Sequence, residues 1–261
     1  NYSDGPCGFA YNPGTALNEK YQRHFFVTEF PGKNVRAFRT EPDGAGFKMV
    51  GEHVAHHGTM TTGINFGADG ALYLADWGNN GWAPHEKGRI MKLDAPGAAD
   101  HPLRKQTRKL LGEGFAKRAV PELVELLAHA AQRIRLEAQF ELAKRKNVKA
   151  LAKVAAGSEN QLARLHGIWG VGQISRRYAS ANAPLLPLLK DADAEVRAQT
   201  VKVLGDAGYN AAHATVVTLL RDKSARVRAQ AAIALSKLDQ GAGDALIRLI
   251  AENNGNDPVV H

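Results

Sequence analysis

Residues Glu195 to Gly205, EVRAQTVKVLG, carry a pattern that recurs along the chain. Apolar or small residues lie four positions apart in this stretch, so they share one face of a helix. The same pattern appears at spacings of 29, 33 and 31 residues. Aligned on their first arginine, the copies are RLEAQFELA from Arg135, RLHGIWGVG from Arg164, RAQTVKVLG from Arg197 and RAQAAIALS from Arg228. Each copy therefore predicts an amphipathic helix.

Three columns of the alignment form the predicted buried face. They are Ile134, Ala163, Val196, Val227 and Val260; then Ala138, Gly167, Thr200 and Ala231; then Leu142, Val171, Leu204 and Leu235. A second apolar segment precedes each copy, at residues 121–129, 148–155, 183–190, 213–221 and 243–251. Two helices per period of about 30 to 45 residues predict an α-solenoid, whose units bury their faces only against neighbours. These helix pairs resemble HEAT repeats, and residues 119–261 would hold four of them and the start of a fifth.

Both ends of the sequence are expected to be cut. The first residues contain no Met and run directly into sequence typical of strands. At the other end, the apolar face of Leu246, Ile247 and Ile250 has only the short segment up to His261 to cover it, whereas solenoids close this face with a capping repeat. Within the solenoid, Asp222 and Ser224 predict the N-cap of the helix that contains Val227.

The composition is that of an ordinary globular protein, with 44% hydrophobic and 23% charged residues. No apolar run reaches the roughly 18 residues that a transmembrane helix needs. The single cysteine, Cys7, excludes an internal disulfide and a CxxCH haem-attachment site within these residues. Residues 1–100 hold 9 Lys and Arg against 11 Asp and Glu, and residues 101–261 hold 25 against 15. The net charge of +8 therefore comes from the helical part.

Residues 8–94 predict β-structure. Short aromatic and β-branched runs occupy residues 24–30, 34–40, 47–53 and 88–94, and two more strands flank a turn at Asp69 and Gly70. The phrase that runs from Gly63 to Asp76 is of the kind that β-propellers repeat once per blade. We therefore predict about two blades of a partial propeller over residues 1–97, with the remaining blades outside this sequence, because two blades leave unpaired edges. Residues 98–118 would form a basic helical connector with Leu103, Leu110 and Leu111 as its apolar anchors.

Several strings are specific enough to indicate a family. They are GPCGFAYNPGTALNEKYQRHFFVTEFPG (5–32), INFGADGALYLADWGNNGW (64–82), KGRIMKL (87–93), LLAHAAQRIRLEAQFELAKR (126–145) and ARLHGIWGVGQISRR (163–177). Together they resemble membrane-bound dehydrogenase-like proteins that carry a C-terminal haem-binding domain of the CxxCH type. In that family a propeller like that of glucose/sorbosone dehydrogenases precedes HEAT repeats and a cytochrome c module, and the proteins are exported to the periplasm or cell envelope.

The resemblance implies a redox role for the full-length protein. Its substrate would be a carbohydrate, and its cofactors would be pyrroloquinoline quinone, calcium and haem c. This chain lacks the earlier blades, where such a propeller would keep its catalytic base, and lacks the cytochrome c module. We therefore expect no cofactor within these 261 residues and no dehydrogenase activity from them alone.

A candidate sugar-binding rim lies in the loop DWGNNGW. Trp77 and Trp82 could stack on sugar rings while Asp76 bonds hydroxyl groups. The alternative, which we favour, is that Trp77 packs between blades and Asp76 bonds loop amides. His56 and His57 are adjacent on a predicted strand and so point to opposite faces, which argues against a shared metal. Arg89 is expected to be a structural ion partner.

The arginines at the start of the four copies have two interpretations. They could line a surface that grips acidic ligands, or they could bond the carbonyl groups and acids of the preceding turn and tie one repeat to the next. We favour the second. His24, His166 and Trp169 are expected to be packing residues.

Two hypotheses for function remain. The first is a piece of an exported dehydrogenase-like protein in which the HEAT solenoid is a spacer and docking surface for the haem module. The second is a non-catalytic scaffold that binds protein partners. Nucleic-acid binding is not expected, because the basic residues are spread among acids without interleaved aromatic side chains. No nucleophile elbow, zinc-protease or phosphate-loop motif is present.

Overall fold

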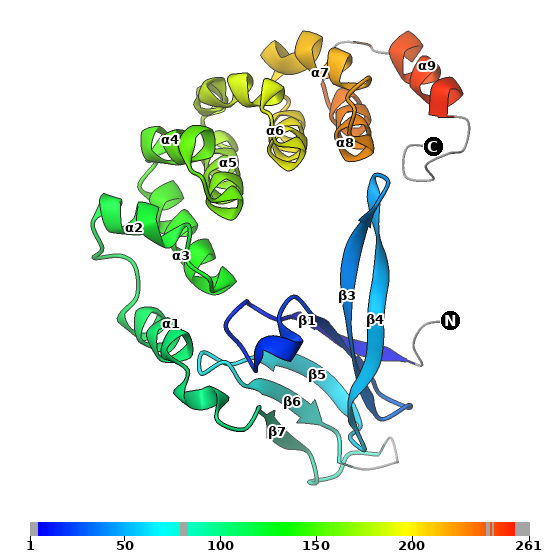
Figure 1. Ribbon diagram of the computed structural model, residues 1–261, viewed down its shortest axis with the longest axis vertical. Coiled ribbons are helices and arrows are strands. Elements are labelled where there is room, and N and C mark those ends of the chain that lie inside the picture. The colour runs from blue at the N-terminus through cyan, green and yellow to red at the C-terminus, as the bar shows by residue number, and fades with distance from the viewer. Residues whose placement is uncertain (1–4, 79–82, 239–240, 242, 254–261) are drawn as a thin grey trace. The chain divides into compact units, whose positions relative to one another are not determined.

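A computed structural model describes residues 5–78, 83–238, 241 and 243–253. The chain divides into two compact units. One comprises Asn1–Glu41, Lys48–Gly114 and Ala130–Ile134, and the other comprises Pro42–Phe47, Phe115–His129 and Arg135–His261. Strands dominate the first unit and helices dominate the second (Figure 1).

The strands form two small antiparallel sheets. The four-stranded sheet has the order β1–β2–β3–β4 and the three-stranded sheet the order β5–β6–β7, both in chain order. The strands are β1 (Pro6–Tyr11), β2 (Phe25–Glu29), β3 (Asn34–Asp43), β4 (Gly46–His57), β5 (Thr61–Phe66), β6 (Leu72–Asp76) and β7 (Arg89–Leu93). The predicted runs are therefore strands, and β5 and β6 flank the turn at Asp69 and Gly70 as predicted. Neither a closed barrel nor a propeller is formed by the described residues, so the propeller remains a prediction.

One apolar core joins the two sheets. Phe26 of β2 meets Phe66 of β5 edge to face, with ring centroids 5.6 Å apart. In β6 the side chains alternate between buried and half-buried, so that Leu72 and Leu74 face the core. A Cβ atom at Gly8 of β1 would lie 3.0 Å from Ile64 of β5, so glycine allows these two strands to approach closely.

A buried arginine holds helix α1 (Pro102–Glu113) to the sheets. Arg104 is only 2% exposed, and it donates to the backbone carbonyl of Asp69 and to both carboxylate oxygens of Asp94, the latter at 2.8 Å. The expectation that Leu103 anchors this helix is wrong, because its side chain is 39% exposed. Two short 3-10 helices, η1 (Glu19–Tyr21) and η2 (Ala98–Asp100), complete this unit.

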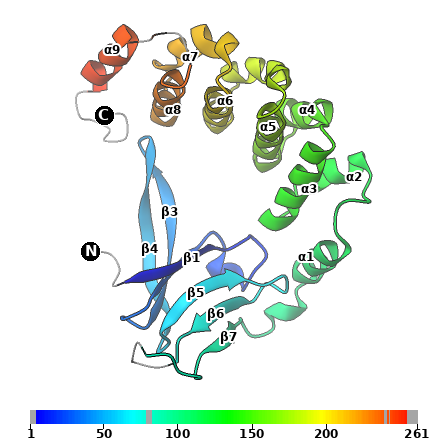
Figure 2. The same ribbon diagram turned by 180° about the vertical axis from the view of Figure 1, so that it is seen from behind.

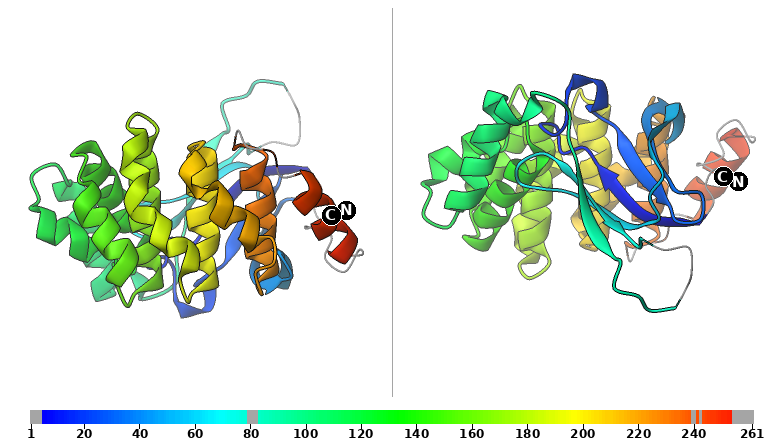
Figure 3. Two further views of the ribbon diagram at one scale, coloured as in Figure 1. Left: turned by 90° about the horizontal axis from the view of Figure 1, so that it is seen from above. Right: turned by 90° about the horizontal axis from the view of Figure 1, so that it is seen from below.

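The helical unit consists of helix pairs that follow one another in chain order (Figure 3). The second helices of the pairs form one layer and the first helices form the other (Figures 1 and 2). The first helices are α2 (Val120–Leu126), α4 (Val148–Gly157), η3 (Ala179–Lys190), α7 (His213–Leu219) and α9 (Gly243–Asn253). The second helices are α3 (Gln132–Lys144), α5 (Gln161–Ser175), α6 (Ala194–Asp206) and α8 (Ala225–Leu235), and the short η4 (Asn210–Ala212) precedes α7.

The columns read from the sequence are buried in the structure. Every described member is buried, from Ile134, Val196 and Val227 in the first column to Leu142 and Leu204 in the third. Gly167 shows why a small residue stands in the middle column: a Cβ atom there would lie 2.6 Å from the carbonyl oxygen of Leu151, so α4 and α5 could not pack as closely. Val260 lies outside the described residues.

The segment at residues 183–190 differs from the prediction. It belongs to η3, a 3-10 helix of 12 residues, instead of an α-helix. Pro184 and Pro187 lie inside it. Each proline lacks an N–H donor and clashes with an α-helical carbonyl one turn earlier, which disfavours α-helical bonding here.

The ends of the later helices follow the sequence signals. Ser224 is the N-cap of α8 and accepts a hydrogen bond from the Val227 N–H, and the Asp222 carboxylate accepts one from the Ser224 N–H. In α9, Leu249 is buried, whereas Ile247 is 65% and Ile250 is 49% exposed. No helix in the described part of the chain is long and apolar enough to cross a membrane.

Candidate functional site

The predicted sugar-binding loop is only partly described. Asp76 is 5% exposed, and its carboxylate accepts hydrogen bonds from the N–H groups of Met60 and Gly78 and from Arg89 at 2.8 Å. These contacts give Asp76 and Arg89 a structural role in this loop. Trp77 packs edge to face against His85 and Phe30, with centroids 4.9 and 6.4 Å apart. Trp82 lies outside the described residues, so the sugar-binding rim remains a prediction.

The adjacent histidines His56 and His57 lie on β4, as the sequence predicts. The Nδ1 atom of His57 lies 2.8 Å from the Asn34 amide oxygen. Among the residues that the structure describes, no group of three His, Cys, Asp or Glu side chains could hold a metal ion.

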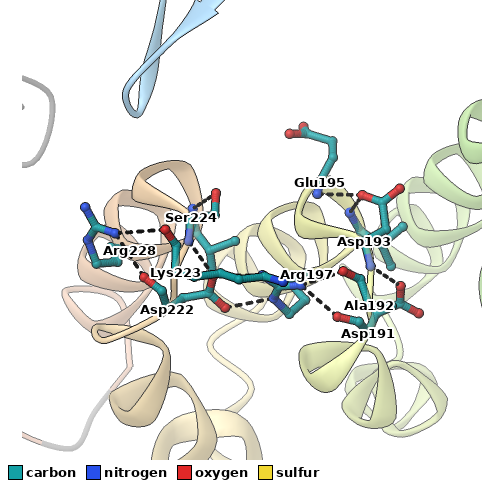
Figure 4. Close-up of polar contacts among 11 residues, drawn as sticks. Asp191, Ala192, Asp193, Glu195, Arg197, Asp222, Lys223, Ser224 and Arg228 are labelled. Carbon is teal, nitrogen blue, oxygen red and sulfur yellow. Dashed lines mark hydrogen bonds and ion pairs between the residues drawn. The ribbon is translucent and has the colours of Figure 1, made fainter.

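Arg164 and Arg197, two of the repeated arginines, tie one helix pair to the next, and Figure 4 shows this for Arg197. Arg197 of α6 forms a two-point ion pair with Asp222 of the following pair, at 2.8 and 2.7 Å, and also donates to the carbonyl group of Asp191 in its own preceding turn. Arg164 likewise pairs with Asp191 and bonds the carbonyl group of Ala155. Both acids precede the next second helix. For Arg164 and Arg197 this confirms the interpretation that the arginines join repeats, while Arg228 donates to the carbonyl groups of Asp222 and Lys223 in its own preceding turn.

The ion pair changes the ionisation of Asp222. Burial of its carboxyl group acts to raise the pKa, but the hydrogen bonds from Arg197 and from the Ser224 N–H outweigh burial. The pKa of Asp222 therefore lies below its usual value, and the pair is charged at neutral pH. Because neither side chain is more than 7% exposed, this is a buried ion pair.

A buried chain of hydrogen bonds links α3 to α5. Arg135 donates from Nε to Nε2 of His166 at 3.2 Å, and His166 Nδ1 lies 2.7 Å from the amide oxygen of Gln139. Gln139 in turn donates to the amide oxygen of Gln173 at 3.1 Å. Since Nε2 accepts a hydrogen bond, the Nδ1 atom carries the proton and donates it to Gln139. Burial first, and then the positive charge of Arg135, lower the pKa of His166 to about 4.

A groove of about 510 Å³ opens on the layer of second helices, over α3, α5 and α6. Its lining combines apolar and aromatic side chains with amides and charged groups. The indole N–H of Trp169 donates to the amide oxygen of Gln199 at 2.9 Å, which fixes the ring across two helix pairs. We call this the amide groove; its lining includes Leu136, Gln139, Trp169, Gln173, Arg176 and Val203.

A second pocket of about 440 Å³ adjoins the amide groove at the ends of α3 and α5. Gln173 lines both. We call this the cationic pocket; its lining includes Phe140, Lys144, Lys146, Gln173, Arg177 and Tyr178. Phe140 and Tyr178 are 44% and 45% exposed. The ammonium group of Lys146 lies 4.6 Å from the centroid of the Tyr178 ring, and its hydrogen bond lowers the pKa of Tyr178 below the usual value.

The sequence prediction missed these residues. Two basic runs, Lys144-Arg145-Lys146 and Arg176-Arg177, are the signal that could have identified the pocket, because both fall at the end of the second helix of successive pairs. Their shared position predicts that stacked repeats bring them together.

Comparisons with known proteins support the helical part only. Residues 182–260 match the family described as HEAT repeats. A comparison with curated proteins gives no match. Among solved structures, a crystal structure of an engineered protein from the Northeast Structural Genomics Consortium is similar over 52% of this chain and 68% of its own, with 20% identity and a TM-score of 0.34. So low a TM-score carries no argument here. The family match covers the later helix pairs, and the paired helices as a whole form a HEAT-like helical region.

Proposed function

We propose that the HEAT-like helical region binds another protein through the layer of second helices. HEAT and related repeats form extended surfaces that suit such binding, because each repeat adds a helix to one continuous layer. On this layer the amide groove and the cationic pocket adjoin at Gln173.

The observation that carries the proposal is the hydrogen-bond chain that ends at Gln173. Arg135, His166 and Gln139 are buried and hold the Gln173 amide from below, while Gln199 holds the Trp169 ring. Side chains held in this way lose little conformational entropy when a partner binds. The groove is therefore preorganised for polar and aromatic contacts, which are typical of protein interfaces.

A library of displayed random peptides tests this proposal. The immobilised protein should select peptides whose binding falls at least about tenfold with Phe140→Ala or Gln173→Ala, since central interface residues carry most of the binding energy. Leu162→Ala is the matched control, because Leu162 is 45% exposed on α5 but lines neither pocket. Selected peptides that bind all three variants equally would contradict the proposal.

We also propose that the two sheets are consecutive propeller blades. Their strands run in chain order, and their cores meet at Phe26 and Phe66, which supports this arrangement. An experimental structure of the full-length protein tests it: the sheets should occupy neighbouring places in a ring, and an open or sandwich arrangement would contradict it. Dehydrogenase activity, its cofactors and export remain predictions from the resemblance, since no described residue tests them.

A further inference from the structure

We infer that the cationic pocket and the adjoining amide groove bind an acidic peptide segment of a partner protein, in which carboxylates flank an apolar or aromatic side chain. This inference rests on the proposed function and names the chemistry of the partner. It depends on the charges of the pocket, on its exposed rings and on the groove beside it.

The charged side chains that line the cationic pocket are all positive. Lys144 is the last residue of α3 and Lys146 follows it, and Arg176 and Arg177 follow α5. In the described part of the chain, none of these four side chains has a carboxylate within ion-pair distance. By contrast, Arg145 between the two lysines is held by Glu141 and by backbone carbonyl groups. The neighbouring arginine thus has an internal counterion. Lys146 bonds Tyr178, but no carboxylate among the described residues neutralises the pocket cations, so an external anion can do so.

The partial negative charge at the C-termini of α3 and α5 explains only some of the cations found there. The C-terminus of a helix carries partial negative charge, so one cation beyond each end is expected. Here each end has two cations without a carboxylate partner in the described part of the chain. Three of them line the cationic pocket, and Arg176 lines the adjoining amide groove. Clustered like charges repel each other, and a bound anion relieves that repulsion.

The rings in the pocket define the rest of the ligand. Phe140 and Tyr178 are nearly half exposed, and Ala143 and Ile174 lie beside them. Such a surface can bury an apolar or aromatic side chain, while the cations around it meet carboxylates. The amide groove continues past Gln173, whose amide can bond the backbone of an extended segment.

Acidic protein fits this surface better than nucleic acid does. The amide groove contains Asp206, which pairs with Lys202 and Lys237. The positive charge is therefore interrupted beyond the pocket. Nucleic acid binding needs a row of phosphate contacts, and its affinity scales with their number. A short acidic segment needs only the local cluster.

Fluorescence anisotropy with labelled peptides tests the inference directly. The probe is a short peptide in which Glu alternates with Leu, and its counterpart has Gln in place of Glu. The Glu peptide should bind the protein at least about tenfold more tightly than the Gln peptide, and a rise in salt from about 0.05 to 0.5 M should weaken its binding, because exposed ion pairs are screened.

Charge reversal locates the site. The double variant Lys144→Glu with Arg177→Glu should bind the Glu peptide at least about tenfold more weakly than the natural sequence does. Lys149→Glu with Lys153→Glu is the matched control, since these exposed lysines of α4 give the same change in net charge away from the pocket, and binding should stay within about twofold. Urea unfolding of both variants checks that they remain folded.

Three outcomes would overturn the inference: equal binding of the Glu and Gln peptides, equal losses in the two double variants, or displacement of the Glu peptide by duplex DNA with a steep salt dependence. Its failure can be separated from that of the proposed function. If displayed peptides selected by the protein contain no excess of Asp and Glu but still depend on Phe140 and Gln173, the proposed function stands and the acidic partner is wrong.

Discussion

Arg135 donates a hydrogen bond to His166, with 3.2 Å between Nε and Nε2, and this contact fixes which nitrogen of the imidazole carries the proton. His166 is 2% exposed and packs edge to face against Trp169, with centroids 5.0 Å apart. A second proton, on Nε2, would break the hydrogen bond from Arg135 and make His166 a cation buried beside the Arg135 cation. The groove above this pair therefore depends on a neutral histidine.

The first prediction is a loss of stability in mild acid. The pKa of His166 is lowered from 6.5 to about 4, so between these values the unfolded chain binds a proton that the folded chain does not. Stability should be fully present above pH 6.5 and should fall by about 3 kcal/mol as the pH drops to 4. The aspartates with lowered pKa values add a loss only from the acid end of this window downward, and His24, whose pKa is lowered first by burial, adds to the loss within it. Urea unfolding at a series of pH values measures the loss.

His166→Asn is the control for this pH effect. Asparagine is uncharged, so the variant should be less stable at neutral pH but should lose much less stability between pH 6.5 and 4. A variant with the same pH dependence as the natural sequence would show that other groups cause it.

The second prediction concerns the ion pair between Arg197 and Asp222. Arg197→Met should destabilise the protein by about 3 to 5 kcal/mol, because it leaves the Asp222 carboxylate buried without its partner. Lys202→Met removes an ion pair with Asp206 in which both side chains are at least 40% exposed, and should cost less than about 1 kcal/mol. Chemical denaturation measures both. Similar values for the two variants would mean that the arginine column does not join repeats.

The third prediction tests the close approach of α4 and α5. Gly167→Ala should cost about 1 to 3 kcal/mol, because the new methyl group meets the backbone of Leu151 and Ala155. Gly157→Ala is the control, since a Cβ atom there has no neighbour within 4 Å, and alanine should be neutral or slightly stabilising. Thermal unfolding distinguishes the two, and a tolerated Gly167→Ala would contradict the close packing.

The fourth prediction concerns the anchor of α1. Arg104→Met should cost about 3 kcal/mol or more, because it leaves Asp94 and the carbonyl group of Asp69 without their donor. Leu103→Ala should cost less than about 1 kcal/mol, since this side chain is 39% exposed. The reverse order of the two losses would restore leucine as the anchor.

The sequence was most informative in the helical part, where the same helical spacing of apolar residues recurs in each copy. Val196, Thr200 and Leu204 were predicted to be buried because helical spacing places them on one face, and the structure confirms that all three are buried. Pro184 and Pro187 carried a signal for the 3-10 helix that the apolar pattern concealed. Arg104 could not be predicted, because a buried arginine is tolerable only with partners such as Asp94 that tertiary structure brings near it.

The candidate site also depends on tertiary contacts that the sequence does not show directly. The sequence suggested Asp76 and Trp77 as sugar-binding residues, because polar and aromatic side chains are close together there along the chain. In the structure the Asp76 carboxylate accepts hydrogen bonds from the Gly78 N–H and from Arg89. The pocket at Lys144 and Arg177 needs residues more than 30 positions apart to converge. Such convergence follows from the stacking of helix pairs, which a single repeat does not reveal.

Hydrogen exchange with and without the Glu peptide tests the central claim most directly. Binding should slow exchange of amides within residues 140–146 and 173–178, because these segments line the pocket, and should leave residues 148–157 of α4 unchanged. The Gln peptide should produce no such protection at the same concentration. Protection confined to the first helices or to the sheets, or none when binding is saturated, would contradict the account.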